Sequence, residues 1–178
     1  MKLGLARHFQ VPHNQLQLLN REGFNAWTRW YDGQNAEAPK AGNEFGTWDV
    51  CYCSDLPRAL ATAKMLFRGS IRNTSELREV PFGPFFPGRV IMPLLVWQAW
   101  SRLGWLLGHG SQPETRTETH SRVAAFLRRI RIENSGKNVL LVSHGFLMQI
   151  LGSELRKTGF RGKIPLRPHW GRVYTFEE

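Results

Sequence analysis

Two histidines and two arginines stand at places in the sequence from which they could act together on a phosphate group. Arg7 and His8 end a short apolar run at the N-terminus. Arg58 lies just beyond a second apolar run, and His144 follows a third. A guanidinium group binds phosphate oxygens through paired hydrogen bonds, and an imidazole can attack phosphorus as a nucleophile. These residue types therefore predict phosphoryl chemistry.

The expected reaction begins at His8. Neighbouring arginines disfavour protonation of its ring, which leaves a ring nitrogen free to attack. His144 can donate to an equatorial phosphate oxygen, and Gly145 lets a backbone N–H at a helix N-terminus approach the anion. Glu79 is the candidate general acid, because a carboxyl beside a phosphate dianion can hold a proton near neutral pH.

The segments around these residues alternate between strand and helix patterns. Strands are expected over the short apolar run 3–6, the strand-like run 48–53 and the continuous apolar run 139–142. Helices are expected over residues 57–66 and 146–157. Ser54 and Asp55 offer capping side chains for the first of these helices, and Pro57 suits its first turn. Strands that alternate with helices predict an α/β fold with a mostly parallel central sheet.

The polar residues of interest all fall at the strand-to-helix junctions. They are Arg7, His8, Ser54, Asp55, Arg58, Ser143 and His144. In open parallel sheets, ligands bind beyond the carboxyl ends of the strands. The junctions therefore predict one shared site at that edge.

Residues 84–116 differ from the rest of the chain. The stretch 91–107 is strongly apolar and carries Trp97, Trp100 and Trp105. It is interrupted by Pro93, Gln98, Ser101 and Arg102, which disfavours a transmembrane span. A position on a membrane surface, where tryptophans are common, is a second reading. We expect instead a helical insertion that packs over the sheet edge as a substrate lid. A further helix is expected over 117–132 and a surface loop over 35–46.

Composition limits the remaining possibilities. The 178 residues suggest one domain over 1–178. The two cysteines, Cys51 and Cys53, lie on one face of a strand and read as core residues, so no metal site is expected. The net charge of +10 and the basic run 128–131 raise the possibility of nucleic-acid binding, but no known binding motif accompanies them. The N-terminal apolar run is too short for a signal peptide, so we expect the protein to be cytoplasmic. The oligomeric state is left open.

Four motifs occur in a characteristic order. They are Arg7-His8, Ser54-Asp55-Leu56-Pro57-Arg58-Ala59, Leu77-x-Glu79-x-x-Phe82-Gly83 and Val142-Ser143-His144-Gly145. In this order they resemble the histidine phosphatase superfamily, in its phosphoglycerate-mutase-like branch. The resemblance implies a three-layer α/β/α sandwich that needs no metal or cofactor.

The resemblance also implies roles for individual residues. His8 would be the phosphorylated nucleophile, with Glu79 as proton donor. Arg7, Arg58 and His144 would form the phosphate pocket, and Asn14, six positions beyond the nucleophile, would contact phosphate. The sequence departs from the family at Phe9, where a glycine is usual, and at Gln10, where an acidic residue is usual. We expect the Phe9 side chain to pack inward while its carbonyl still orients the imidazole.

These features predict a phosphomonoester hydrolase that forms a phosphohistidine on His8 and acts on a small phosphorylated substrate. One alternative is a mutase, which must retain the phosphoryl group and exclude water; mutases of this family tend to be longer chains. The other alternative is a non-catalytic protein that binds a phosphorylated ligand, with Phe9 as a sign of lost activity.

Overall fold

The computed structural model describes residues 1–37 and 46–178. The expected loop 35–46 therefore falls largely outside the described residues. The helices are α1 (Arg21–Asp32), α2 (Pro57–Leu66), α3 (Leu94–Leu106), α4 (Arg116–Glu133) and α5 (Gly145–Lys157). The strands are β1 (Lys2–Arg7), β2 (Leu18–Leu19), β3 (Val50–Ser54), β4 (Ile71–Thr74), β5 (Met92–Pro93), β6 (Asn138–Ser143) and β7 (Val173–Glu177). A 3₁₀ turn spans Ser75–Leu77.

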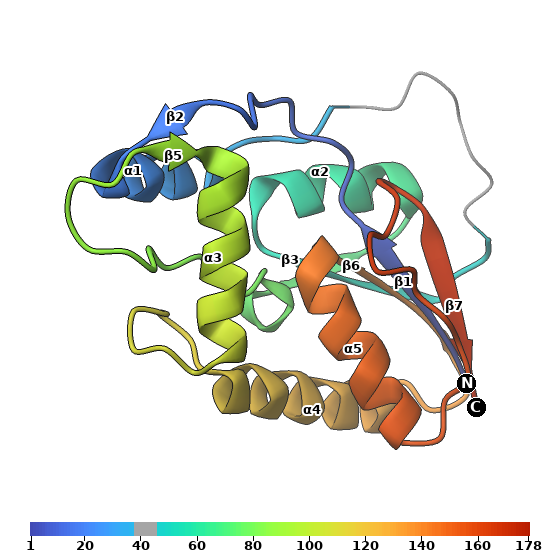
Figure 1. The fold of residues 1–178 in the computed structure, drawn as a ribbon. Coiled ribbons are helices and arrows are strands. Elements are labelled where there is room, and N and C mark those ends of the chain that lie inside the picture. The colour runs from blue at the N-terminus through green and yellow to red at the C-terminus, as the bar shows by residue number, and fades with distance from the viewer. Residues whose placement is uncertain (38–45) are drawn as a thin grey trace.

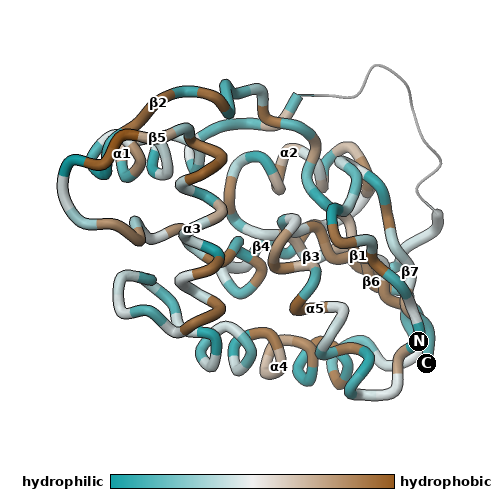
Figure 2. Tube along the Cα trace, viewed as in Figure 1, coloured by the Kyte–Doolittle hydropathy of each residue, from teal (hydrophilic) through white to brown (hydrophobic). Residues whose placement is uncertain are grey.

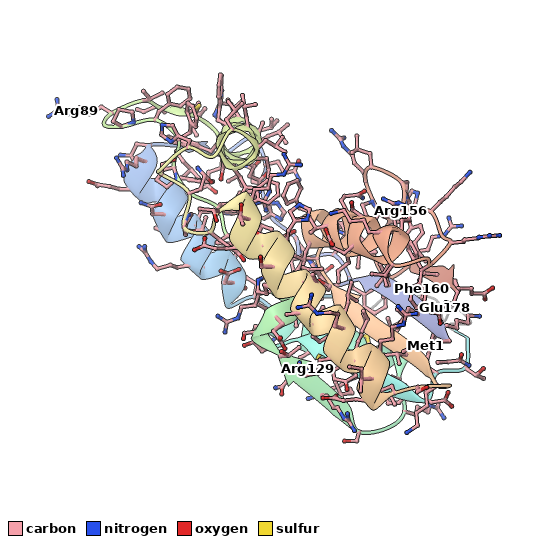
Figure 3. All side chains as sticks on the ribbon, turned by 90° about the horizontal axis from the view of Figure 1, so that it is seen from below. Met1, Arg89, Arg129, Arg156, Phe160 and Glu178 are labelled. Carbon is pink, nitrogen blue, oxygen red and sulfur yellow. The ribbon has the colours of Figure 1, made fainter. Side chains whose placement is uncertain are left out.

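The central sheet has the strand order β4-β3-β6-β1-β7. The first four of these strands are parallel to their neighbours, and β7 runs antiparallel beside β1. Because Lys2 lies opposite Glu177, the two chain ends lie close together, as Met1 and Glu178 do in Figure 3. β2 and β5 form a separate antiparallel ribbon beside the sheet (Figure 1).

Alternate residues of the strands build two cores, one on each face of the sheet. Leu3 and Leu5 join the core beneath α4 and α5, whereas Ala6 joins the core beneath α2. Cys51 and Cys53 belong to the second core, as expected, and burial raises the pKa of their thiols to about 12 and about 11. Helices thus cover both faces, which confirms the three-layer α/β/α architecture (Figure 1). Figure 2 shows the apolar colouring that runs through these strands.

Helix α2 begins at Pro57, as predicted, but its cap is not the one that the sequence suggested. Leu56 occupies the N-cap position and makes no side-chain capping hydrogen bond. The expected capping residues have other partners, because Ser54 contacts His144 and the Asp55 carboxylate binds Arg78. Pro57 supplies no N–H of its own, so this end has one fewer donor to satisfy.

A third apolar cluster joins α1 to α3 beside the carboxyl edge of the sheet. Phe24 of α1 stacks on Trp97 of α3, with ring centroids 5.2 Å apart. Trp97 and Trp105 are both buried, so these side chains are not available to a membrane surface. No helix within residues 1–37 and 46–178 is long and apolar enough to cross a membrane. The helix expected within 91–107 therefore packs against the rest of the fold through one side, which includes Leu94, Trp97 and Trp105.

Candidate active site

A cleft of about 990 Å³ lies where the parallel strands end. Arg7 and His8 enter it from the end of β1, and Arg58 from the first turn of α2. His144 is the N-cap residue of α5, and Glu79 lies on the loop after β4. The structure thus brings these five predicted residues into one cleft, at the sheet edge that the junction rule indicated.

His8 is buried and its tautomer is set by the next peptide group. Its Nδ1 atom lies 2.6 Å from the carbonyl oxygen of Phe9. A carbonyl can only accept, so Nδ1 carries the hydrogen and Nε2 keeps its lone pair. Burial and the charge of Arg58 lower the pKa of His8 to about 3. At neutral pH the ring is therefore neutral, with one nucleophilic nitrogen.

His144 lies beside His8, with ring centroids 5.0 Å apart. Its Nε2 is 2.8 Å from the hydroxyl oxygen of Ser54. That oxygen accepts from the N–H of Leu56, so the Ser54 hydroxyl hydrogen can be donated to Nε2, and Nδ1 then carries the ring hydrogen. Among the described residues, its Nδ1 atom has no hydrogen-bond partner. Burial, followed by the neighbouring His8 and arginines, lowers the pKa of His144 well below its usual range. Both histidines are close enough for one phosphate to touch them.

Arg7 is held in place from three sides. Its Nη1 donates to the Pro168 carbonyl at 2.9 Å, and its guanidinium stacks on Trp170, 3.2 Å from the ring centroid. Gly145 lies against the same group, where a Cβ would come within 3.0 Å of Nε. A side chain at position 145 would therefore push the guanidinium away from the start of α5. Burial lowers the pKa of Arg7 from its ordinary value.

Arg58 is almost fully buried and is anchored by α1. It donates to the Tyr31 carbonyl at 2.9 Å and to the Asp32 carboxylate at 3.1 Å. The Tyr31 ring also lies under the guanidinium, with 4.5 Å between the carbon and the ring centroid. A buried charge needs such partners. They fix the guanidinium within the cleft.

Glu79 joins the loop after β4 to the start of α5. Its carboxylate accepts from the backbone N–H groups of Phe146 at 3.0 Å, Leu147 at 2.9 Å and Val80 at 2.9 Å. The first two are donors that a helix N-terminus leaves without intrahelical partners. Glu79 therefore holds α5 in position while one side of it lines the cleft.

Asn14 lies elsewhere. It is exposed, and its side-chain oxygen accepts from the N–H of Leu16 at 3.0 Å. It lines a neighbouring hollow of about 430 Å³ and not the cleft that contains His8. The structure thus does not bring Asn14 to the other predicted residues.

Phe9 points away from the cleft, as predicted. Its side chain is 4% exposed and packs in the core beneath α2. The ring fills the space beside Gly171, where a Cβ would lie 2.0 Å from it and where φ is +67°. The backbone N–H of Phe9 donates to the hydroxyl of Thr62. The absence of a side chain at Gly171 therefore makes room for the Phe9 ring, and the Phe9 carbonyl still orients His8.

Three residues at the site were not predicted from the sequence: Tyr31, Asp32 and Trp170. The first two come from α1, whose start is marked by Asn20; the Asn20 side chain accepts from the N–H of Gly23 and is a recognisable cap. Trp170 comes from the segment after α5 and lies 5.1 Å from His8 between ring centroids. Within the described ranges no cluster of three or more His, Cys, Asp or Glu side chains is arranged to hold a metal ion.

Comparison with solved structures shows the same fold in phosphate-handling enzymes. Phosphoglycerate mutase from Bacillus anthracis is 19% identical, with a TM-score of 0.56 over 99% of this chain and 91% of that one. A phosphoserine phosphatase mutant from Entamoeba histolytica, in complex with phosphoserine, is 20% identical, with a TM-score of 0.54 over 88% and 80%. Mycobacterial glucosyl-3-phosphoglycerate phosphatase is 21% identical, with a TM-score of 0.55 over 88% and 79%.

No protein with a curated description matches the sequence closely enough to count as a relative. The model of the histidine phosphatase superfamily (branch 1) matches residues 26–170, which is most of the chain. The matched range begins after Arg7-His8 and includes the motifs around Arg58, Glu79 and His144. The chain therefore belongs to the histidine phosphatase superfamily.

Proposed function

We propose that this protein hydrolyses phosphomonoesters through a phosphohistidine formed on His8. The observation that carries the proposal is the hydrogen bond from His8 Nδ1 to the Phe9 carbonyl. It leaves Nε2 unprotonated in a cleft that also contains Arg7, Arg58 and His144. A buried neutral imidazole among cationic groups suits attack on an anionic phosphate.

In the first step, Nε2 of His8 attacks phosphorus and the ester P–O bond breaks. Arg7 and Arg58 bind the phosphoryl oxygens, and His144 donates from its ring to a third oxygen as charge redistributes. The proton that the leaving oxygen needs comes from solvent and is delivered through the Glu79 carboxyl group, so the leaving group departs as an alcohol. His8 then carries the phosphoryl group.

In the second step, a water molecule attacks the same phosphorus and the N–P bond breaks. Glu79, now a carboxylate, accepts the proton of that water. Inorganic phosphate leaves, and His8 returns to the neutral tautomer that the Phe9 carbonyl favours. No step requires a redox change or any co-substrate other than water.

The test is a rapid-quench experiment with p-nitrophenyl phosphate labelled in the phosphoryl group. We expect acid-labile, base-stable label on the wild-type protein and none on His8→Asn. Release of phosphate without any trapped label on any time scale would favour direct attack by water. Transfer of the label to an added alcohol faster than to water would favour the mutase alternative.

A further inference from the structure

The outer part of the cleft differs chemically from its floor. The floor holds Arg7, Arg58 and the two histidines, whereas the walls above it combine apolar and aromatic side chains with polar ones. The partly exposed apolar and aromatic residues include Tyr31, Leu56 and Phe82. A phosphate on the floor would therefore direct the rest of the ester along apolar side chains.

Other arginines line the cleft, but several of them are already neutralised by the protein. Arg78 donates to both oxygens of Asp55, at 2.6 and 2.8 Å. Arg122 donates to both oxygens of Glu114, each at 2.9 Å. Bidentate pairs of this kind satisfy both partners. These cations are therefore poorly placed to hold a second anionic group of a substrate.

Arg102 is held by a backbone carbonyl and by two aromatic rings. It donates to the Val80 carbonyl at 2.8 Å and lies between the rings of Phe82 and Phe146, 3.9 and 4.4 Å from their centroids. Burial lowers the pKa of this group. Its guanidinium thus supports an aromatic wall, and it also lies 4.0 Å from the Glu79 carboxylate. Apart from Arg7 on the floor, Arg167 is the lining arginine that forms no ion pair with another described residue.

Two large apolar side chains stand exposed on the rim of the cleft. Leu166, from the segment after α5, is 86% exposed, and Leu95, in the first turn of α3, is 49% exposed. The backbone N–H of Leu95 donates to the Gln15 carbonyl, which joins the start of α3 to the segment that leads into β2. Exposed apolar side chains in and next to the β2–β5 ribbon are Leu16, Leu18, Val90 and Ile91. Figure 2 shows the apolar colouring along both ribbon strands.

From this arrangement we propose that the cleft takes phosphomonoesters whose alcohol carries an extended apolar chain. The inference rests on the proposed function and names its substrate class. The phosphate lies on the Arg–His floor, the first carbons contact the aromatic walls, and the chain continues over Leu95 and Leu166. An apolar rim beside a cleft is a common mark of a ligand that covers it. A free alkyl phosphate and a phosphorylated lipid in a bilayer offer the same chemistry.

The test is a series of n-alkyl phosphates from ethyl to octyl, each used below the concentration at which it forms micelles. We expect kcat/KM to rise about two- to fourfold per methylene while the chain crosses the walls and rim. In Leu95→Ser and Leu166→Ser, the ratio of octyl to ethyl phosphate turnover should fall at least about threefold. This ratio is measured within one preparation, so it does not depend on the fraction of folded protein.

Matched controls come from elsewhere on the chain. Leu106 lies on the same helix as Leu95 and is 51% exposed, and Ile132 on α4 is 81% exposed; neither lines the cleft. Leu106→Ser and Ile132→Ser should keep the wild-type ratio. Vesicles of phosphatidylcholine with phosphatidate distinguish the two sources, since faster release from vesicles than from octyl phosphate would assign the substrate to a bilayer.

The outcome separates this inference from the proposed function. His8-dependent release from p-nitrophenyl phosphate supports the hydrolase whatever the chain-length result. If kcat/KM does not change with alkyl chain length while p-nitrophenyl phosphate is still hydrolysed, this inference is wrong and the proposed function stands. Faster turnover of phosphoserine than of octyl phosphate also overturns it and would point to Arg167 as a binding group for a second charge. No release from any ester would overturn the proposed function itself.

Discussion

The Nδ1 atom of His8 donates to the carbonyl oxygen of Phe9, the residue that most departs from the family pattern. The hydrogen bond needs only the peptide group, so the substitution of phenylalanine for glycine leaves it intact. The side chain is placed on the other side, against Gly171. The carbonyl group of residue 9 thus orients the nucleophile, whereas the side chain of the same residue packs in the core.

Replacement of His8 should abolish turnover. His8 is buried, so His8→Asn is preferable to alanine because it leaves a smaller cavity. We expect phosphate release from p-nitrophenyl phosphate to fall to the background rate, with a cooperative thermal transition retained. Turnover near the wild-type level in the folded variant would contradict the mechanism.

Glu79→Gln should slow phosphate release most for esters with poor leaving groups. General acid catalysis contributes about 10²–10⁴-fold, and an activated aryl ester needs less of it than an alkyl ester. Glu79 also accepts from the N–H groups of Phe146 and Leu147, so part of the loss could come from a displaced α5. Circular dichroism and the melting temperature measure that part. An equal loss on aryl and alkyl phosphates would assign Glu79 to positioning.

The stability of the protein should fall as the pH falls below about 6.5. Burial lowers the pKa of His8 to about 3 and that of His144 well below its usual range, whereas both titrate near 6.5 in the unfolded chain. Below about pH 6.5 the unfolded chain binds more protons than the folded protein does, so acid favours unfolding. Urea midpoints at pH 7, 6 and 5 measure the effect.

In His8→Asn, the pH dependence should become shallower by about one proton, or roughly 1.4 kcal/mol per pH unit. His169→Asn is the control, because it changes an exposed histidine outside the cleft. An unchanged slope in His8→Asn would mean that His8 is not held neutral by burial.

Phe9→Gly should destabilise the fold without opening the cleft. The ring is buried beside Gly171, and the loss of a buried aromatic side chain typically costs about 3–5 kcal/mol. Chemical denaturation gives the stability change, and turnover of small and bulky aryl phosphates gives the effect on the cleft. A large gain on bulky esters with unchanged stability would show that Phe9 gates access instead.

Anion affinity should distinguish Arg58 from Asn14. Arg58→Ala removes a buried cation from the cleft and should weaken binding of inorganic phosphate at least about tenfold, as expected for a lost charge-assisted hydrogen bond. Asn14→Ala changes an exposed side chain that lines a different hollow, so affinity should stay within about twofold. Isothermal titration calorimetry measures both. A large loss in Asn14→Ala would show that the segment moves to the phosphate on binding.

Several features of this protein follow from the sequence by itself. Apolar runs that end in Arg7-His8 and Val142-Ser143-His144 predict buried parallel strands, and the edge rule for such sheets then brings their ends together. Local pattern also places the start of α2 at Pro57. These predictions succeed because strand burial, helix starts and the position of strand ends depend on residues close together in the chain.

Other features depend on the tertiary structure alone. Asp32 pairs with Arg58, 26 positions away, and the Pro168 carbonyl accepts from Arg7, 161 positions away. No local sequence pattern predicts either contact. The same holds for the separation of Asn14 from the cleft and for the rim formed by Leu95 and Leu166, which come from distant segments. The sequence supplies the reactive groups, whereas their tautomer, anchoring and apolar surroundings arise only when packing brings distant parts of the chain into contact.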